Sequence, residues 1–165
     1  MKKILCLLAV FSQFLFADDD VGGFWKNMNE DTGLIQCVLA MYPYEGQYYA
    51  RIVATYDDDG KMKDNIYHPK EKAPGIAGNR DYCGLDFIWD LDDSGMVYKG
   101  KIIDPRKGGI YNAEVWRDGA DLIIRGKLMF FGKNTTWLPV SKEDFPANFK
   151  MPDVSTFVPV IPQGK

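Results

Sequence analysis

The chain has 165 residues and a formal net charge of −3, a length that fits a single domain. Aromatic residues make up 14% of it, which excludes an intrinsically disordered protein because so many large apolar side chains can build a core. The acidic balance, with no run of clustered Lys and Arg, disfavours nucleic acid and anionic lipid as partners.

Residues 1–17 have the three-part pattern of a signal peptide. Two lysines precede an apolar run over residues 4–16, and Ala17 is followed by three aspartates. The run is too short to span a bilayer comfortably, and an acidic flank is unusual beside a membrane anchor. We therefore expect cleavage after Ala17, export of the mature protein, and no stable membrane span once the signal is removed.

From residue 34 onward the sequence is typical of short antiparallel strands. Residues 34–42 are nearly all apolar, which indicates a strand covered on both faces. Residues 47–56 alternate between two faces, as expected of a strand with one buried and one solvent-facing side. Residues 85–91 alternate in the same way, and residues 133–140 give the last strand pattern.

The clearest pattern lies in residues 96–126, which predict three strands joined by two tight connections. Lysines alternate with apolar residues here, so a helix would place lysine in its apolar stripe and is disfavoured. Gly108-Gly109 and Asp118-Gly119 supply the turns. About eight strands are expected in all. Consecutive hairpins favour an all-β, antiparallel up-and-down barrel, because closure removes exposed sheet edges.

Two segments depart from this pattern. Residues 61–84 have no periodicity and predict one long loop, either a lid or binding loop or a plain crossover. Residues 141–165 contain several prolines and little alternation, and they predict an extended tail whose apolar side chains lie against the domain. The expected organisation is a signal peptide at 1–17, a barrel domain at 18–140 and a tail at 141–165.

The predicted barrel interior combines large aromatic side chains with alanine and with glycines such as Gly100 and Gly126, which are expected to leave room. The candidate ligand-binding residues on the apolar faces are Tyr48, Tyr56, Trp89, Tyr98 and Tyr111. Large rings beside very small residues leave room, and tyrosine hydroxyls add polar groups, so a small apolar or amphipathic ligand is the expected occupant. The alternative is a tapered barrel in which large and small side chains interlock and leave no pocket.

Arg51 and Arg125 each stand centrally in a predicted strand. Alternation points both side chains outward, where each would pair with Glu114 or an aspartate. A local bulge could instead turn one of them inward, where it would anchor the carboxylate of an anionic ligand.

Cys37 and Cys83 remain after the predicted cleavage. In an oxidising compartment they could form a disulfide, which would close a long loop. Alternatively, both are buried as small hydrophobic thiols. The sequence favours neither.

No set of catalytic residues is visible, and we predict that the protein is not an enzyme. His68 is the single histidine, and in a loop such a side chain is more often simply solvated. Asp90 to Gly95 matches half of a calcium loop, but Lys101 stands where a bidentate glutamate is required. We expect no metal and no cofactor.

Several short blocks carry a resemblance to a known family. They are Gly23-Phe24-Trp25, Asp31-Thr32-Gly33, Ala50-Arg51-Ile52, Gly84-Leu85, Gly100 to Tyr111, Leu122 to Gly126 and Thr136-Trp137. Their spacing resembles the bacterial family called domain of unknown function 2147, small exported proteins with a lipocalin-like β-barrel. The resemblance implies that fold and, with the signal peptide, a periplasmic or secreted protein of the bacterial envelope, but it implies no activity. It also implies that Trp25 plugs the barrel floor, as the first tryptophan of lipocalins does.

Two functions therefore remain open. The first is an exported binding module that holds a small apolar or amphipathic ligand in its barrel. The second is a structural or interaction protein of the envelope, with a filled barrel, no ligand and an unknown protein partner.

Overall fold

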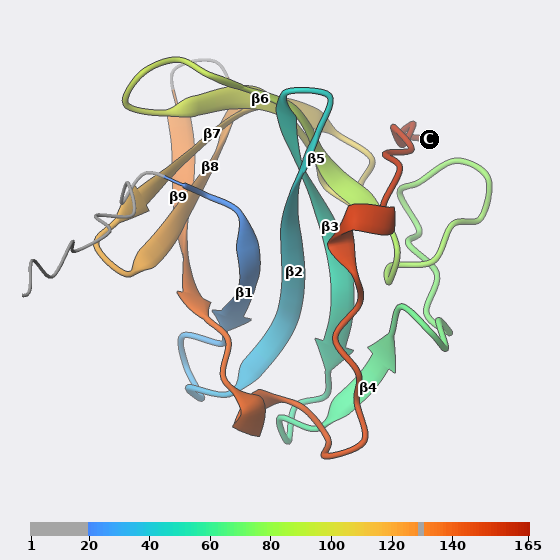
Figure 1. The fold of residues 1–165 in the computed structure, drawn as a ribbon. Coiled ribbons are helices and arrows are strands. Elements are labelled where there is room, and N and C mark those ends of the chain that lie inside the picture. Colours follow the sequence, from blue (N-terminus) through green and yellow to red (C-terminus); the bar gives the residue numbers. More distant parts are fainter. Residues whose placement is uncertain (1–19, 129–130) are drawn as a thin grey trace, which may run out of the picture.

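The computed structural model describes residues 20–128 and 131–165 and shows an all-β fold (Figure 1). The predicted signal peptide, residues 1–17, lies outside the described residues. The strands are β1 (Gly23–Met28), β2 (Ile35–Tyr44), β3 (Gln47–Tyr56), β4 (Met62–Asn65), β5 (Asp86–Asp93), β6 (Tyr98–Ile103), β7 (Ile110–Asp118), β8 (Asp121–Leu128) and β9 (Phe131–Pro139). Two short 3-10 helices follow, η1 (Lys142–Asp144) and η2 (Val154–Thr156).

The sheet closes on itself as a barrel. Its strand order is β2-β1-β9-β8-β7-β6-β5-β3-β4, and an additional pairing of β2 with β3 joins the two ends. Eight strands, all antiparallel, thus form the wall, while β4 is an extra strand outside the closed ring. The predicted fold class, an up-and-down barrel of about eight strands, is confirmed.

β3 forms hydrogen bonds along one edge with three different segments. Its first half pairs with β5, from Tyr48 to Arg51. Ile52 exchanges backbone hydrogen bonds with the end of the long loop, donating to Leu85 O at 3.0 Å. The last residues of β3 pair with β4, from Ala54 to Tyr56. The long loop therefore packs beside β3, and its backbone extends the sheet.

The long loop is fixed internally by one buried carboxylate. Asp64 is 2% exposed, and its side chain accepts hydrogen bonds from the backbone N–H groups of Lys70 (2.9 Å) and Glu71 (3.0 Å). A buried carboxylate needs such donors, because burial without them costs several kcal/mol. The aperiodic stretch of residues 61–84 is therefore an ordered part of the fold.

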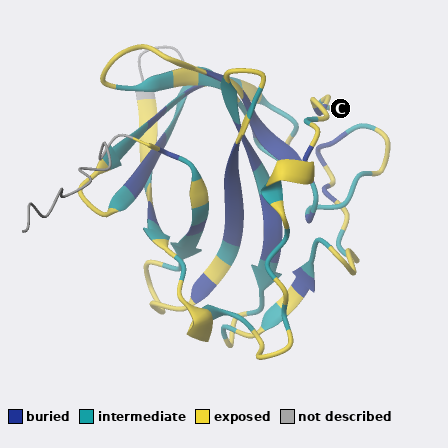
Figure 2. Cartoon of the chain, in the orientation of Figure 1, coloured by how far each residue is buried: buried dark blue, intermediate teal, exposed yellow. Residues whose placement is uncertain are grey.

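β2 is buried on both of its faces. Residues 38–42 are each at most 1% exposed, whereas β-strands that face solvent on one side show alternate exposure. Figure 2 shows this strand and its neighbour β3 as the most continuously buried part of the barrel wall. The cause is the C-terminal tail, which runs along the outside of these strands (Figure 1).

The tail is attached through a buried ion pair on the outer face of the barrel. Asp86 is 0% exposed and accepts hydrogen bonds from Arg51 Nε (2.9 Å), Arg51 Nη2 (2.7 Å) and Tyr42 Oη (2.7 Å). The tail completes the set, because Val160 N donates to Asp86 at 2.9 Å and Val158 O accepts from Arg51 at 2.8 Å. One carboxylate thus links β2, β3, β5 and the tail.

An aromatic ring of the tail covers this ion pair. The guanidinium carbon of Arg51 lies 4.4 Å from the centroid of the Phe157 ring, and that ring packs edge-on against Tyr42 at 5.1 Å. Burial lowers the pKa of Arg51, but the hydrogen bonds and charge of Asp86 more than offset this, so the pKa stays raised and the guanidinium stays charged. The cover excludes water and strengthens the electrostatic attraction.

The end of the tail is held by a close approach of three glycines. Lys165 N donates to Gly75 O at 2.9 Å, and Gly164 pairs with Ile76. A Cβ atom on Gly164 would lie 2.1 Å from Gly108 O, and one on Gly75 would lie 2.3 Å from Gly108 N. Only glycine allows three backbone segments to meet this closely.

Removal of the buried carboxylate should destabilise the fold strongly. We expect Asp86→Ala to lower the free energy of unfolding by about 3–5 kcal/mol, because Arg51 would remain buried without its partner. The measurement is urea unfolding followed by tryptophan fluorescence. Glu71→Ala, which removes a half-exposed pair with Lys63, is the control and should cost at most about 1 kcal/mol. Equal losses in both variants would contradict the role assigned to the buried pair.

Candidate ligand-binding site

One end of the barrel is closed by the segment that precedes β1. Val21 is 0% exposed, and its carbonyl accepts a hydrogen bond from Trp25 Nε1 at 3.0 Å. The Arg117 guanidinium stacks on the Trp25 ring at 4.9 Å and donates to the backbone oxygen of Asp20 at 3.0 Å. Trp25, at 4% exposure, thus lies in the core beneath this segment.

The inner face of the barrel becomes more exposed toward the opposite end. Along β7, Val115 is 0% and Ala113 1% exposed, while Tyr111 is only half-buried. Along β8, Ile124 is 3% exposed and Gly126 is half-buried. These residues share one face, because Ala113 pairs with Gly126 and Val115 with Ile124. Solvent therefore reaches the interior at the Tyr111 end, which we name the mouth.

The described residues at the mouth are mostly apolar or small, together with the Tyr111 hydroxyl and the exposed Lys133, which pairs with Gly126 across β8 and β9. Ile102 pairs with Tyr111 across β6 and β7, and both are half-buried. Among the described residues, the nearest atom to a Cβ placed on Gly126 is Ile102 Cγ2 at 3.6 Å, an ordinary contact distance, so none of them blocks a larger side chain at this position. The Tyr111 hydroxyl lies over Gly109, where a Cβ would be only 2.5 Å from it. This combination suits an apolar molecule with a polar group at the rim.

Two of the five predicted lining residues meet near the closed end. Tyr48 and Tyr98 pack edge-on, with ring centroids 5.4 Å apart, and Tyr48 Oη donates to Asp20 Oδ1 at 2.8 Å. Burial, followed by the hydrogen bond to Asp20, raises the pKa of Tyr48 to about 12. Trp89 is 6% exposed and belongs to the core. These three rings therefore fill space.

Tyr56 faces the tail, contrary to the expectation that it lines the interior. Val38 pairs with Ala54 but Leu39 pairs with Ile52, so the intervening residue of β3 is an unpaired bulge that reverses the alternation. Tyr56 Oη consequently donates to the backbone oxygen of Asp144 at 2.8 Å. Of the five predicted aromatic residues, Tyr111 is the one at the mouth.

Gly100 was expected to leave room in the interior, but backbone occupies that space. A Cβ on Gly100 would lie 2.5 Å from Trp89 O and 2.8 Å from Asp90 O. Asp90 has a φ of 53°, and the pairing of β5 with β6 shifts at this point, so a bulge pushes the β5 backbone against the glycine. Gly100 is therefore needed for strand packing.

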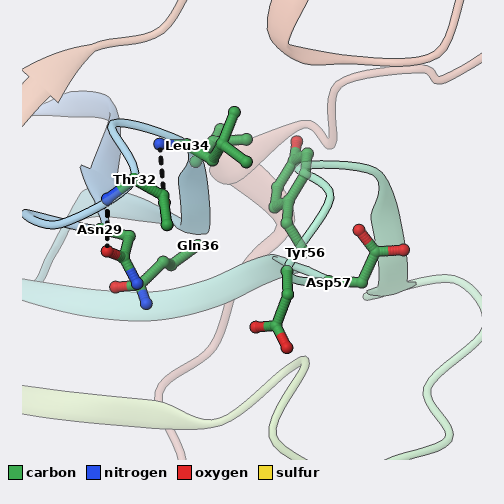
Figure 3. Close-up of a pocket in the computed structure, with 8 residues that line it drawn as sticks. Asn29, Thr32, Leu34, Gln36, Tyr56 and Asp57 are labelled. Carbon is green, nitrogen blue, oxygen red and sulfur yellow. Dashed lines mark hydrogen bonds between the residues drawn. The ribbon is translucent and has the colours of Figure 1, made fainter.

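A cavity of about 300 Å³ lies between the β1–β2 loop and the end of β3 (Figure 3). Asn29 Oδ1 accepts from Thr32 N at 3.0 Å, and Thr32 Oγ1 accepts from Leu34 N at 3.3 Å, which fixes the loop side. Tyr56 and Asp57 form the other side.

Within the described ranges, no cluster of three or more His, Cys, Asp or Glu side chains could hold a metal ion.

The two predicted anion anchors both point outward and are paired. Arg51 binds Asp86 beneath the tail, and Arg125 Nη1 lies 3.4 Å from Glu114 Oε2. Glu114 also accepts a hydrogen bond from Lys127, which, with the nearby cations, lowers the pKa of this carboxyl. Alternation predicts that both arginines lie outside the barrel and pair with acidic residues, and the structure has both pairs. Neither arginine is available to a ligand in the barrel.

The two cysteines are unbonded thiols in this structure. Cys37 lies opposite Thr55 in the β2–β3 ladder, and Cys83 is 4% exposed at the end of the long loop. Burial raises the pKa of both thiols to about 12. A thiol with such a pKa is almost fully protonated at neutral pH and therefore a poor nucleophile.

The strand order and the closed end define a small up-and-down β-barrel. A family model described as "Uncharacterized protein conserved in bacteria (DUF2147)" matches residues 23–138, and the chain belongs to this family. A solved structure, "Protein HP1028 from the human pathogen Helicobacter pylori belongs to the lipocalin family", is similar in fold with a TM-score of 0.59. The two share 23% identity over 76% of this chain and 86% of the other. A search of curated proteins gives no match.

The two inner-face glycines should respond differently to alanine. Gly100→Ala should destabilise the fold by about 1–3 kcal/mol, because the new methyl group would collide with β5 backbone that cannot move freely. Gly126→Ala should change stability by less than about 0.5 kcal/mol, because its methyl group meets Ile102 at contact distance. Thermal unfolding of the two variants makes the comparison. A larger loss at Gly126 would show that the mouth has no free space.

The raised thiol pKa values predict slow chemistry in the native state. At pH 8 a disulfide-exchange reagent should modify Cys37 and Cys83 far more slowly in folded protein than in urea, where both pKa values return to about 8.5. Absorbance of the released thiolate counts the reacting groups. Immediate reaction of either thiol in the native protein would contradict the burial. If unfolded protein shows no thiol until reductant is added, the two are paired instead.

Proposed function

We propose that the barrel binds a small apolar or amphipathic molecule through its mouth, with no chemical conversion. The observation that carries the proposal is the gradient of exposure along the inner face, from buried residues at the Trp25 end to the half-buried Ile102, Tyr111 and Gly126. An apolar surface that water reaches gains free energy when an apolar ligand covers it, at about 25 cal/mol per Å². A barrel of eight strands is wide enough for one such ligand.

The similarity to a protein described as belonging to the lipocalin family supports the same proposal through the fold. A polar end of the ligand would lie at the rim, where the hydroxyl of Tyr111 stands beside Gly109. The apolar end would lie over Gly126 and Ile102, toward Ala113. The interior beyond Ala113 is occupied by core side chains, so the site accommodates a short or bent molecule.

The mouth can be blocked by one substitution. Gly126→Leu places an isobutyl group in the open space beside Ile102, and we expect it to weaken binding of a hydrophobic fluorescent probe at least about tenfold, since it replaces the ligand contact. Fluorescence titration gives the dissociation constant, and native mass spectrometry of protein purified from its own cell envelope identifies a co-purified ligand. Tm should remain within a few degrees of the wild-type value.

Thr136→Leu is the matched control. Thr136 is exposed on β9, on the face opposite to the buried Trp137. This variant therefore also introduces a leucine, but outside the barrel. Probe affinity should be unchanged in this variant. If the wild-type protein binds no probe and carries no ligand, or if both variants weaken binding equally, the barrel proposal fails.

A second candidate function rests on the tail. Val158, Val160 and Ile161 are exposed by 59%, 48% and 46%, although their neighbour Phe157 is buried. Exposed apolar residues in an ordered segment are typical of a protein contact surface. In this alternative the barrel is a filled scaffold for an envelope interaction protein. Replacement of these three side chains by serine should then abolish partner recovery without affecting the Arg51–Asp86 pair.

We also propose that the protein is exported and processed. The support is the sequence pattern of residues 1–17, together with a barrel that begins at Gly23. No helix in the part of the chain that the structure describes has the length and hydrophobicity to cross a bilayer. The N-terminal sequence of protein isolated from the periplasm or medium tests the proposal, and Asp18 as the first residue is the expected result.

A further inference from the structure

The outer face of β6, β7 and β8 carries a cluster of cations that the linear sequence does not reveal. Lys99 pairs with Glu114, which pairs with Arg125 on β8. In the next row Lys101 pairs with Asn112, which pairs with Lys127. Lys99 and Lys101 are exposed, and Arg125 and Lys127 have side-chain exposures of 35% and 34%. We name Lys99, Lys101, Arg125 and Lys127 the cationic face.

This face is locally positive although the chain has a net charge of −3. Glu114 accepts from Lys127 and lies 3.4 Å from Arg125, so one carboxylate is shared between two cations. Lys101 Nζ donates to Asn112 Oδ1, a neutral group, and keeps its charge uncompensated. At the β5 edge, Asp92 is paired with Lys99 in the sheet, and its carboxylate accepts from Gln47. The four cations thus exceed the negative charge within the face.

Apolar side chains flank these cations on the same face. Ile110, two residues before Asn112 on β7, is 50% exposed. Trp116, two residues after Glu114, is half-buried, and the Arg125 guanidinium stacks on it at 5.1 Å. Lysine and arginine beside tryptophan and isoleucine on a sheet surface match the composition of proteins that lie at a membrane interface. A soluble polyanion would use the cations but not the apolar side chains.

A shallow depression in the face could receive a single headgroup. It has a volume of about 260 Å³, and it is lined by Lys99, Gly100, Asn112, Ala113, Glu114 and Lys127. Its lysines supply donors and positive charge for a phosphate oxygen. Asn112 adds a neutral amide, and Glu114 is already occupied by its own cations.

We propose that the cationic face docks on the surface of a bilayer that contains anionic phospholipid. The occupant is a lipid phosphate surface, because the charges are spread over a sheet and flanked by Ile110 and Trp116. Lys101, Asn112 and Lys127 are each adjacent in sequence to a mouth residue, so docking places the mouth close to the lipid. The inference goes beyond ligand binding and holds whether or not the barrel contains a ligand.

Vesicle co-sedimentation tests this proposal with protein that carries residues 18–165, which include every strand and the tail. At low salt the protein should sediment with vesicles of phosphatidylglycerol and phosphatidylcholine and stay in solution with phosphatidylcholine alone. The double variant Lys101→Gln/Lys127→Gln should reduce the partition coefficient at least about tenfold, because each basic residue contributes near an anionic surface. Raising the salt concentration should release the wild-type protein.

The matched control is Lys142→Gln/Lys150→Gln, which removes the same charge from two exposed lysines of the tail. It should sediment like the wild type. If the first variant fails to fold by circular dichroism, Lys99→Gln/Lys101→Gln replaces it, because neither lysine has a carboxylate hydrogen bond. Equal loss in the control, no preference for anionic vesicles, or release of the protein by soluble polyphosphate at the same phosphate concentration would overturn the proposal.

Discussion

The buried ion pair between Arg51 and Asp86 is the interaction on which the arrangement of this protein depends. A carboxylate at 0% exposure is tolerable only when every lone pair that faces the interior has a donor. Asp86 obtains these donors from three different parts of the chain, including the backbone of Val160 in the tail. The tail is therefore part of the domain, since the barrel wall alone leaves the carboxylate incompletely satisfied. This requirement also explains why the middle of β2, residues 38–42, is buried on both faces.

The tail cover separates two faces of the barrel that differ in chemistry. Over β2 and β3, polar groups are paired with one another and shielded by Phe157. Over β6, β7 and β8 the sheet is bare, and the cations are only partly paired. The mouth opens beside the bare face, at the level of Lys101 and Lys127. A ligand taken from a lipid surface would thus reach the mouth directly beside the cationic face.

Much of the fold follows from the sequence, because the period of two is strong and local. The alternation in residues 96–126 predicts the strands β6, β7 and β8, and it correctly places Arg125 outside the barrel. The same reasoning fails at Tyr56 because one extra residue in β3 reverses the facing of those that follow. It also fails at Gly100, where a small residue indicates close backbone packing and not free space. Bulges depend on the partner strand, so the alternation of one strand cannot reveal them.

The candidate surfaces were harder to foresee than the strands. The cations of β6 and β8 are separated by more than twenty residues in sequence, and only the register of β7 between them brings them together. The burial of Asp86 beneath the tail was equally hard to predict, because a proline-containing tail has no periodic pattern that indicates what it contacts. Composition predicts an acidic chain and a poor match to anionic partners, whereas the folded surface has one positive face. The affinity of a surface for anions depends on the net charge of that surface and not of the whole chain. The strand register decides which residues lie on the same surface.

The distance along the chain between the partners of the buried pair has a consequence for the order of folding. Arg51 and Val158 are separated by 107 residues, and Asp86 and Val160 by 74. Contacts of such long range form late, because a large loop must close before they contribute any stability. During synthesis the barrel strands therefore exist for a time with Asp86 open to water on the outer face. The tail follows the barrel strands in the sequence, so the segment that shields this site from water is added after the wall and from its outer side.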